Sequence, residues 1–484
     1  MAFHQNFILT LKKIKKMKRN KIVLASLCFY LFQISQVISQ NTVIEYNSFV
    51  ENVIKNNPIA KRAANLKTYG ELNYKSARGN YDPKINGSYT NKFFNGSNYN
   101  SSLNSEVKQQ IFTNQYLKFG YDYGIGNNLN PDMYTPTSGL PYLGVEVGLL
   151  QGMMIDYTRA NVLKAKEYKN YYSAENKIEL NNLLFEASTQ YFDWLFSAKQ
   201  LALNSYFMQI ANQRLRGIES LAEIGEKAAI DTIEAAIFYQ SRLLDFQNST
   251  IDFQKTNNEI ASFNWNESYT PFEILNCSTS DSLDLYFSKV KNSFMKTLLI
   301  DTLNNPVLIK YNSLQKVLEI ENRLKKEMIK PKLNVSYNFL SNENAPDNTV
   351  LSTNNYKWGA NISFPLLLRN SVNNYKMSKI NSQNNNFELI NKSNELNYKL
   401  NSLKQNINTI TEQLLNAERT ARYSKQLVDA EKIKFTNGES SLFLLNTREN
   451  KWLESELKLA EYKLKFIKTV LNVIYLKGNL DYKF

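Results

Sequence analysis

The sequence predicts a mixed α and β chain in which long antiparallel coiled-coil helices are joined to short amphipathic strands, with this arrangement present twice. Three observations predict the fold class: the scarcity of helix-breaking residues, a period of two in several short segments, and an internal repeat. Glycine (16) and proline (10) are both rare among the 484 residues. Together they reach roughly half of their usual share. A chain so poor in helix breakers is expected to contain long helices.

Two long segments are predicted to be helical throughout. The segment from Met153 to Ile224 has no proline and one glycine, and the segment from Leu366 to Asn437 has neither residue. At 1.5 Å per residue, each helix would reach roughly 100 Å, which is far more than a globular domain needs. Apolar or small residues also recur at alternating spacings of four and three, which is typical of a coiled-coil seam. The two seams are Leu180, Leu184, Ala187, Tyr191, Trp194, Ala198 and Leu201, and Leu403, Ile407, Ile410, Leu414, Ala417 and Ala421.

Four short segments alternate between apolar and polar residues and are predicted to be strands. The alternation puts apolar and aromatic side chains on one face and polar side chains on the other. Over about ten residues this pattern fits barrel strands with lipid on one side and water on the other. It fits equally an ordinary half-buried sheet of a globular domain, so the alternation by itself leaves both open. The segments are 84–93, 142–149, 332–339 and 356–364.

The chain contains an internal repeat. The motif Asn-Asn-Pro at Asn56–Pro58 recurs 248 residues later at Asn304–Pro306, and the strand opening at Pro83 recurs at the same offset at Pro331. The offset later falls to about 215 because the first copy carries an insertion, residues 95–141. Self-similarity of this kind indicates a duplicated architecture.

The predicted organisation follows from this repeat. Residues 40–290 form the first structural repeat, 291–478 form the second, and 479–484 are a C-terminal tail. Residues 263–290 interrupt the helices and are expected to form an irregular belt around the middle of the helical part. Whether the insertion 95–141 adds strands, covers a mouth or merely decorates it stays open on the sequence alone.

Residues 1–39 are predicted to be an export signal peptide. A basic stretch precedes an apolar run of eleven residues, 22–32, and small or tolerated side chains precede a cleavage site before Gln40. This is the layout of a secretory signal. Residues 1–16 look like an upstream extension, with translation beginning at Met17. The alternative is a retained membrane anchor.

The composition disfavours several classes of chemistry. Once 1–39 is removed, no histidine and a single cysteine, Cys277, remain. Zinc fingers, histidine-based triads, haem-attachment motifs and disulfide scaffolds are then excluded. A secreted hydrolase is disfavoured because the chain lacks a Gly-x-Ser-x-Gly motif and a metal-ligand cluster. We therefore expect no enzyme activity and no cofactor or metal.

The positive charge does not indicate nucleic-acid binding. Of the net charge of +14, seven charges come from Lys and Arg within residues 1–39. The remaining charge is spread along the chain without a long basic block or a nucleic-acid-binding motif. We expect no nucleic-acid partner.

Four strands are too few to close a barrel around a pore. A ring of chains can close one, since closure leaves no unpaired edge. Three chains would supply twelve strands, which is within the range of known transmembrane barrels. We therefore predict a trimeric 12-stranded transmembrane β-barrel to which each chain gives a four-stranded piece, continued by a barrel of coiled-coil helices.

From about Asn41 to Gly478, the chain resembles the TolC-like outer-membrane efflux family. The resemblance depends on an ordered set of motifs that occurs twice, because no single motif is diagnostic. These motifs are the helix starts at Pro58 and Pro306, the strand openings at Pro83 and Pro331, the strand-to-helix passages 148–152 and 363–367, and the turns 225–231 and 438–442.

The resemblance implies a homotrimer in the outer membrane of a Gram-negative cell. Its short barrel would lie in outer-membrane lipid, and its helical barrel would cross the periplasm. Such a channel-tunnel is the passive exit duct of a tripartite efflux or type I secretion system, and it docks a periplasmic adaptor protein and an inner-membrane transporter without catalysis. The exported cargo and the class of transporter stay open. The alternative from another class is a periplasm-spanning coiled-coil tether without a pore.

The resemblance places two turns at the periplasmic tip. It makes Gly225 and Glu226, and Gly438 and Glu439, candidate adaptor-docking turns. Each glycine also interrupts a helical stretch, where a residue with positive φ can end one helix before the next begins. An ordinary hairpin turn without a partner fits the sequence equally well.

Asp231 and Glu234 are candidates for a periplasmic constriction. Many members of the family narrow the entrance with aspartates six and nine residues after the second-repeat glycine, but this chain has Leu444 and Thr447 there. The same spacing after Gly225 gives Asp231 and Glu234. In a ring these acids would attract cations and repel anions. The alternative is that they are acids at a helix N-terminus, which the helix dipole favours.

Overall fold

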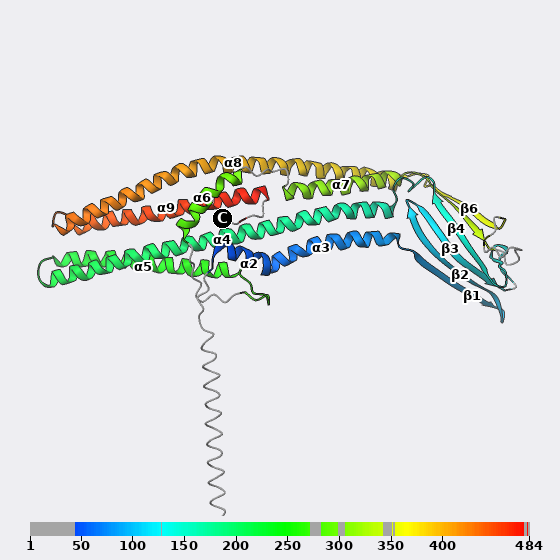
Figure 1. The fold of residues 1–484 in the computed structure, drawn as a ribbon, viewed down its shortest axis with the longest axis horizontal. Coiled ribbons are helices and arrows are strands. Elements are labelled where there is room, and N and C mark those ends of the chain that lie inside the picture. Colours follow the sequence, from blue (N-terminus) through cyan, green and yellow to red (C-terminus); the bar gives the residue numbers. More distant parts are fainter. Residues whose placement is uncertain are drawn as a thin grey trace, which may run out of the picture.

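The chain forms a long rod of helices that ends in a curved sheet (Figure 1). The predicted signal peptide, Cys277 and most of the C-terminal tail lie outside the residues that the structure describes. None of the described helices combines the length and the apolar character needed to cross a membrane. The computed structural model describes residues 44–126, 128–271, 282–298, 305–341, 351, 354–478 and 482.

Helices make up the rod, and two long antiparallel pairs, α4 with α5 and α8 with α9, form its free half (Figure 1). A short 3-10 turn, η1 (Gly79–Tyr81), precedes the first strand, and a second one, η2 (Pro131–Met133), lies between the third and fourth strands in the chain. The helices are α2 (Tyr46–Asn56), α3 (Pro58–Arg78), α4 (Tyr157–Glu223), α5 (Ala229–Ala261), α6 (Leu283–Leu298), α7 (Pro306–Glu327), α8 (Arg369–Thr436) and α9 (Leu442–Lys477).

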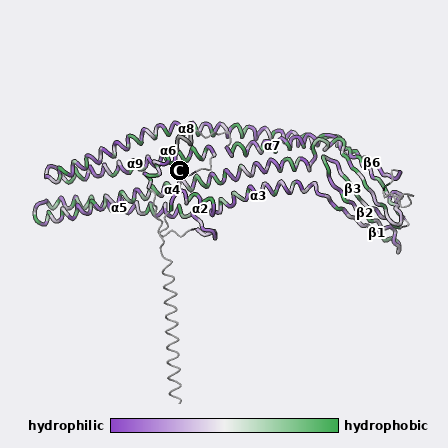
Figure 2. The backbone as a smooth tube through the Cα atoms, in the orientation of Figure 1, coloured by the Kyte–Doolittle hydropathy of each residue, from purple (hydrophilic) through white to green (hydrophobic). Residues whose placement is uncertain are grey.

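Both predicted long helices are confirmed. α4 has 67 residues and α8 has 68. The predicted seam of α4 is buried from Leu184 to Trp194, and that of α8 is buried from Ile407 to Ala421. Hydrophobic and hydrophilic residues are interspersed along the whole length of these helices (Figure 2). Each helix therefore buries a narrow seam and leaves the faces beside it to water.

The repeated Asn-Asn-Pro motif begins a helix in both places. The side-chain oxygen of Asn57 accepts a hydrogen bond from the backbone N–H of Ile59 at 2.9 Å, and Asn305 does the same for Val307 at 2.9 Å. The proline that follows each asparagine fits the first helical position, where its missing N–H costs nothing. The amide of Asn305 also donates to the carbonyl of Leu476 at 2.8 Å. Each motif thus caps its own helix, and the second also fixes that helix against α9.

The helices lie side by side in a single curved layer. Near the sheet the order across the layer is α3, α4, α7, α8, and toward the free end it is α5, α4, α9, α8 (Figure 1). α6 lies across the layer near its middle and packs against α9 and α4. The arrangement leaves α3 and α5 along one long edge of the layer and α8 along the other.

An aromatic core fixes the middle of the rod. Tyr46 of α2 packs against Tyr191 and Phe192 of α4 and against Tyr286 of α6, with ring centroids 5.0–5.5 Å apart. All four rings are at most 2% exposed. The hydroxyl of Tyr46 donates to the Oγ of Ser188 at 2.9 Å, so its polar end is also satisfied. This core joins the start of the first half of the chain to α6 and the long helix α4.

The described strands form one antiparallel sheet of six strands, in the order β1-β2-β3-β4-β5-β6. Every neighbouring pair is antiparallel. The strands are β1 (Lys84–Phe94), β2 (Ser97–Phe112), β3 (Gln115–Ile125), β4 (Leu140–Gly148), β5 (Lys332–Leu340) and β6 (Tyr356–Ser363).

The predicted number of strands per chain, four, is wrong. The insertion 95–141 contributes the hairpin of β2 and β3, which lies between β1 and β4. β2 was not predicted because, between its two register shifts, from Ser101 to Gln110, its apolar face carries only two large apolar residues, Leu103 and Val107. The pattern of period two is therefore weak there. The prediction of a twelve-stranded ring assumed four strands in each of three chains, so it is no longer supported.

Candidate functional site

The register of the sheet divides its side chains into one apolar face and one polar face. Residues directly opposite each other in an antiparallel pair lie on the same face. Tyr89 of β1 is opposite Leu103 of β2, which is opposite Tyr123 of β3. In the second half of the sheet Tyr337 of β5 is opposite Trp358 of β6. The aromatic and apolar side chains thus form a face that continues across all six strands.

The apolar face is exposed in the single chain. Tyr89 is 66% exposed, Trp358 is 64% exposed and Ile362 is 70% exposed. No described helix covers this face (Figure 1). A large exposed apolar surface marks a site for protein or lipid contact.

The polar face carries more lysines than acids. Its charged residues are Lys84, Lys92, Lys108, Lys118, Lys332 and Lys357 against Glu106, Asp122 and Glu146. Like charges directly opposite each other destabilise a sheet, and Lys108 is opposite both Lys84 and Lys118. Glu146 offsets this repulsion, because it lies 2.8 Å from the Nζ of Lys108 and 2.6 Å from that of Lys118. The face is polar, ion-paired and net positive.

The two candidate docking turns have the same backbone structure. Gly225 and Gly438 both have φ of +80°, in the left-handed region that favours glycine. The N–H of Glu226 donates to the carbonyl of Leu221 at 2.9 Å, and the N–H of Glu439 donates to that of Lys434 at 2.8 Å. With the matching bond from each glycine N–H, these are Schellman motifs that end α4 and α8.

The structure brings the two turns together at the free end of the rod (Figure 1). The ammonium of Lys227, in the first turn, lies 5.5 Å from the ring centroid of Phe435, beside the second turn. Beneath them Ile218, Ala235 and Leu442 form a small buried cluster that joins α4, α5 and α9. The candidate residues Gly225, Glu226, Gly438 and Glu439 are all exposed. The tip therefore presents two similar exposed turns next to each other, with exposed apolar side chains such as Ile224 and Phe443 beside them.

Asp231 and Glu234 lie in the first two turns of α5, immediately after the first of these turns. Their side chains are partly exposed. Within the described residues neither carboxylate forms an ion pair. The positions that correspond to them on α9, Leu444 and Thr447, are uncharged, and Leu444 is 42% exposed.

A buried ion pair near the tip was not predicted from the sequence. Arg214 of α4 contacts Glu449 of α9 through both terminal guanidinium nitrogens, Nη1 and Nη2, and the distance from Nη1 to Oε2 is 2.8 Å. Nη1 of Arg214 also donates to the side chain of Asn446 at 2.8 Å. The side chain of Glu449 is 1% exposed and that of Arg214 is 12% exposed. Arginine and glutamate are 235 residues apart in the chain, so no local pattern could have indicated this pair.

α5 carries an exposed apolar stripe that the sequence analysis also missed. Ile230, Ile237, Leu244 and Ile251 recur at intervals of seven, and each is between 59% and 72% exposed. A seven-residue period places them on one side of the helix, as in a coiled-coil seam. The helix already buries a different side against α4. The spacing was visible in the sequence, but only the structure shows that no described helix covers it.

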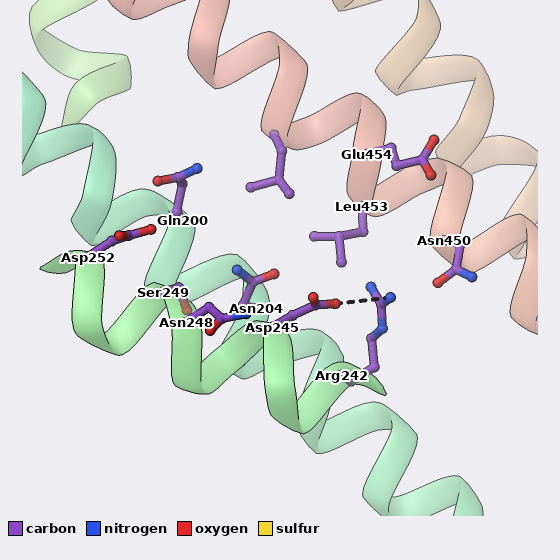
Figure 3. A pocket seen from close by; sticks show the side chains of 11 residues that line it. Gln200, Asn204, Arg242, Asp245, Asn248, Ser249, Asp252, Asn450, Leu453 and Glu454 are labelled. Carbon is purple, nitrogen blue, oxygen red and sulfur yellow. Dashed lines mark ion pairs between the residues drawn. The ribbon is translucent and has the colours of Figure 1, made fainter. Parts of the chain in front are cut away.

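A polar groove of about 320 Å³ lies between α4, α5 and α9 (Figure 3). Its side chains are mostly Asn, Gln, Asp and Glu, and within it Arg242 pairs with Asp245 at 3.0 Å. Small-molecule sites are usually enclosed and mainly apolar, and this groove is open and polar. The described residues contain no group of three or more metal-ligating side chains. We assign no ligand to it.

Asp284 ties α6 to the helical layer. Its carboxylate lies 2.7 Å from the Nζ of Lys463 on α9 and 3.1 Å from that of Lys199 on α4. Burial alone would raise the pKa of Asp284, but the hydrogen bonds and charges of Lys463 and Lys199 bring the pKa below its usual value. A carboxyl with a lowered pKa stabilises the folded state above its unfolded pKa of about 4, and this stabilisation is lost as the pH falls through the folded pKa.

Asp284→Asn is therefore expected to loosen α6 at pH 7 and to have a smaller effect at pH 3. Because the side chain is 45% exposed, solvent screening keeps the loss of stability to about 1 kcal/mol or less. Amide hydrogen exchange of α6 at the two pH values measures the change. Asp252→Asn, at an exposed carboxylate on α5, is the matched control. Equal protection of α6 in the variant and the parent at pH 7 would contradict the assignment.

Comparison with solved structures gives relatives of known fold. The outer-membrane channel CmeC of Campylobacter jejuni is 13% identical, with a TM-score of 0.62, over 89% of this chain and 85% of that one. The open outer-membrane channel MtrE of Neisseria gonorrhoeae is 11% identical, with a TM-score of 0.64, over 89% and 88%. The outer-membrane protein VceC of Vibrio cholerae is 10% identical, with a TM-score of 0.61, over 90% and 96%.

This chain has the fold of outer-membrane channels. The resemblance to the TolC-like family that was drawn from the sequence is confirmed at the level of the fold. No protein-family model and no curated protein matches the chain by sequence. The outer-membrane channel fold covers nearly all of the chain and of each relative, so the rod and the sheet belong to one architecture.

Proposed function

We propose that this chain is the subunit of a homotrimeric outer-membrane channel that acts as a passive exit duct. The observation that carries the proposal is the sheet with one continuous aromatic face and one continuous polar face, mounted on a rod of helices. In a closed ring the aromatic face would meet outer-membrane lipid, and the polar face would line water. The helical rod would then extend into the periplasm. The shared fold with solved outer-membrane channels supports this interpretation.

The two long edges of the chain support a ring of copies. β1, α3 and α5 form one edge, and α8 and β6 form the other. Within the described sheet, β1 and β6 each pair with one strand only. An unpaired strand edge cannot face hydrocarbon, because its backbone polar groups would be unsatisfied. Since the two edges differ, joining them makes a head-to-tail contact, which closes into a ring when the rotation from copy to copy divides a full turn. The number three comes from the family resemblance.

We further propose that the tip of the rod meets the rest of a tripartite efflux or type I secretion system. The exposed turns at Gly225–Glu226 and Gly438–Glu439 have the same backbone structure and lie side by side. A trimer would present six such turns around the tunnel mouth. A ring of similar turns suits repeated docking of a periplasmic adaptor protein, with the inner-membrane transporter beneath it.

Asp231→Asn combined with Glu234→Gln is expected to lower the preference of the channel for cations severalfold. In the ring these residues would supply six carboxylates at the mouth, which concentrate cations there. Without them the lysine-rich polar face of the sheet would dominate and shift selectivity toward anions. The reversal potential of reconstituted channels in a salt gradient measures the change.

The matched control is Glu219→Gln with Glu223→Gln, which removes two exposed charges from α4 near the same tip. The control is expected to keep the selectivity of the parent. If both double variants keep it, Asp231 and Glu234 do not line the constriction.

Purified protein in planar lipid bilayers tests the proposed function as a whole. The channel proposal expects discrete conductance steps from the trimer. A coiled-coil tether without a pore would leave the bilayer insulating while still forming helical oligomers. Absence of conductance from a trimer with its sheet intact would overturn the channel in favour of the tether.

A further inference from the structure

The hairpin of β2 and β3 lies inside the wall of the sheet. β2 pairs with β1 on one side and β3 pairs with β4 on the other, over eleven and eight residue pairs respectively. Removing the hairpin from the wall would break both of these ladders and leave the aromatic face interrupted. β2 and β3 are therefore integral strands of the sheet, as the other four strands are.

The side chains of the hairpin follow the two faces of the sheet. Leu103 on β2 and Phe119 on β3 lie on the aromatic face, because they are in register with Tyr89 and Leu143. Their sequence neighbours, Asn104 and Lys118, lie on the polar face. A hairpin that covered a mouth or lay outside a barrel would have no reason to match both faces of its neighbours.

We propose that the ring described above closes with eighteen strands, six from each of three copies, through pairing of β1 with β6 of the next copy. This inference rests on the proposed trimer but adds the size of its barrel and the surface at which a second copy of the chain joins. β1 (11 residues) and β6 (8 residues) have similar lengths. β1 runs away from the helices and β6 returns to them (Figure 1), so the joined strands are antiparallel.

The widths of the two layers agree with eighteen strands. Next to the sheet each chain has α3, α4, α7 and α8 side by side, so three chains give twelve helices. At 8–10 Å between axes their ring has a circumference of roughly 100–120 Å. Eighteen strands 4.7–4.9 Å apart and tilted by 35–45° give roughly 105–125 Å, and twelve strands give only roughly 70–85 Å. The strand wall can then continue the helix wall without a constriction between them.

Cysteine accessibility on neighbouring positions tests this wall. The background is Cys277→Ser, because Cys277 is the one cysteine outside the predicted signal peptide. Leu103→Cys and Asn104→Cys probe β2, and Phe119→Cys and Lys118→Cys probe β3. The control pair on β1 is Tyr89→Cys and Ser88→Cys, since β1 lies in the wall of a barrel of either size. The probe is a charged maleimide added to purified protein in phosphatidylcholine vesicles.

Eighteen strands predict the same alternation in all three pairs. Cysteines at 88, 104 and 118 should react at least tenfold faster than those at 89, 103 and 119, because lipid shields the second set. Alternation on β1 with equal labelling of both positions on β2 and β3 would overturn the larger barrel and leave the proposed channel standing. Equal labelling within all three pairs would overturn the channel itself and the larger barrel with it.

A direct count of the wall strands tests the proposal even if a cysteine variant fails to fold. Electron cryo-microscopy of the wild-type trimer in lipid nanodiscs is expected to show eighteen wall strands in cross-section, with β1 beside β6 of the next copy. A wall of twelve strands, with β2 and β3 outside it, would refute the proposal. A particle without threefold symmetry would refute the proposed trimer as well.

Discussion

Replacing Ile237 and Leu244 by glutamate is expected to abolish the trimer while the single chain stays folded. Both side chains belong to the exposed stripe of α5 and are 67% and 59% exposed in one chain. In the ring this edge would pack against α8 of the next copy. Each buried apolar side chain contributes about 1.5–3 kcal/mol, and an unpaired buried carboxylate costs several kcal/mol more. The loss recurs at all three interfaces, so assembly should fail.

Size-exclusion chromatography with light scattering in detergent measures the oligomer, and circular dichroism reports the helix content. The control is Ile237→Leu with Leu244→Ile, which changes the same two positions but keeps them apolar. The control is expected to form trimers like the parent. Intact trimers from the stripe variant would show that this edge does not join copies.

Arg214→Met is expected to destabilise the tip by about 3–5 kcal/mol, because it leaves the carboxylate of Glu449 buried without its partner. The structure makes this pair unusual among the described ion pairs, since Glu449 is only 1% exposed. The remaining cation within 4 Å is Lys432, at 3.9 Å, and its side chain is 39% exposed. Hydrogen exchange of α9 around Glu449 should accelerate on the order of a hundredfold or more.

Two controls separate a buried charge from a general effect of mutation. Arg214→Met combined with Glu449→Leu removes both charges and should recover most of the lost protection, because apolar residues can replace a buried pair. Lys451→Met breaks an ion pair with Glu454 whose side chains are 65% and 68% exposed, and it should change little. If Arg214→Met behaves like Lys451→Met, the buried pair does not hold the tip together.

Local patterns were enough to predict the long helices of the rod, but not α6, which begins at Leu283 within the segment 263–290 that was expected to be an irregular belt. The spacing of four and three in α4 and α8 indicated coiled-coil seams, and the structure buries the central part of each seam. The Asn-Asn-Pro motif indicated where α3 and α7 begin, because the cap and the proline act within a few residues. The two glycine turns were equally predictable, since a positive φ after a helix is a requirement that glycine meets locally.

The candidate site was predicted only in part. The sequence identified the turns at Gly225 and Gly438, and the structure places them side by side. It did not indicate the exposed stripe of α5 as a surface, since a seven-residue period alone does not tell a covered seam from an open one. It also could not indicate that Glu146 lies between Lys108 and Lys118, because that arrangement depends on the register of three strands.

The amino-acid sequence alone predicts a chain of long paired helices and amphipathic strands with two similar turns, because capping, helical seams and alternation act over a few residues. The three-dimensional fold was needed to show that the insertion joins the sheet as β2 and β3, that the faces of six strands coincide, and that Arg214 contacts Glu449. These outcomes depend on hydrogen bonds and charges between segments that are far apart in the chain. The position of a strand as poor in apolar residues as β2 is set by its hydrogen bonds to the strands on either side. Its own residues do not show which strands these are.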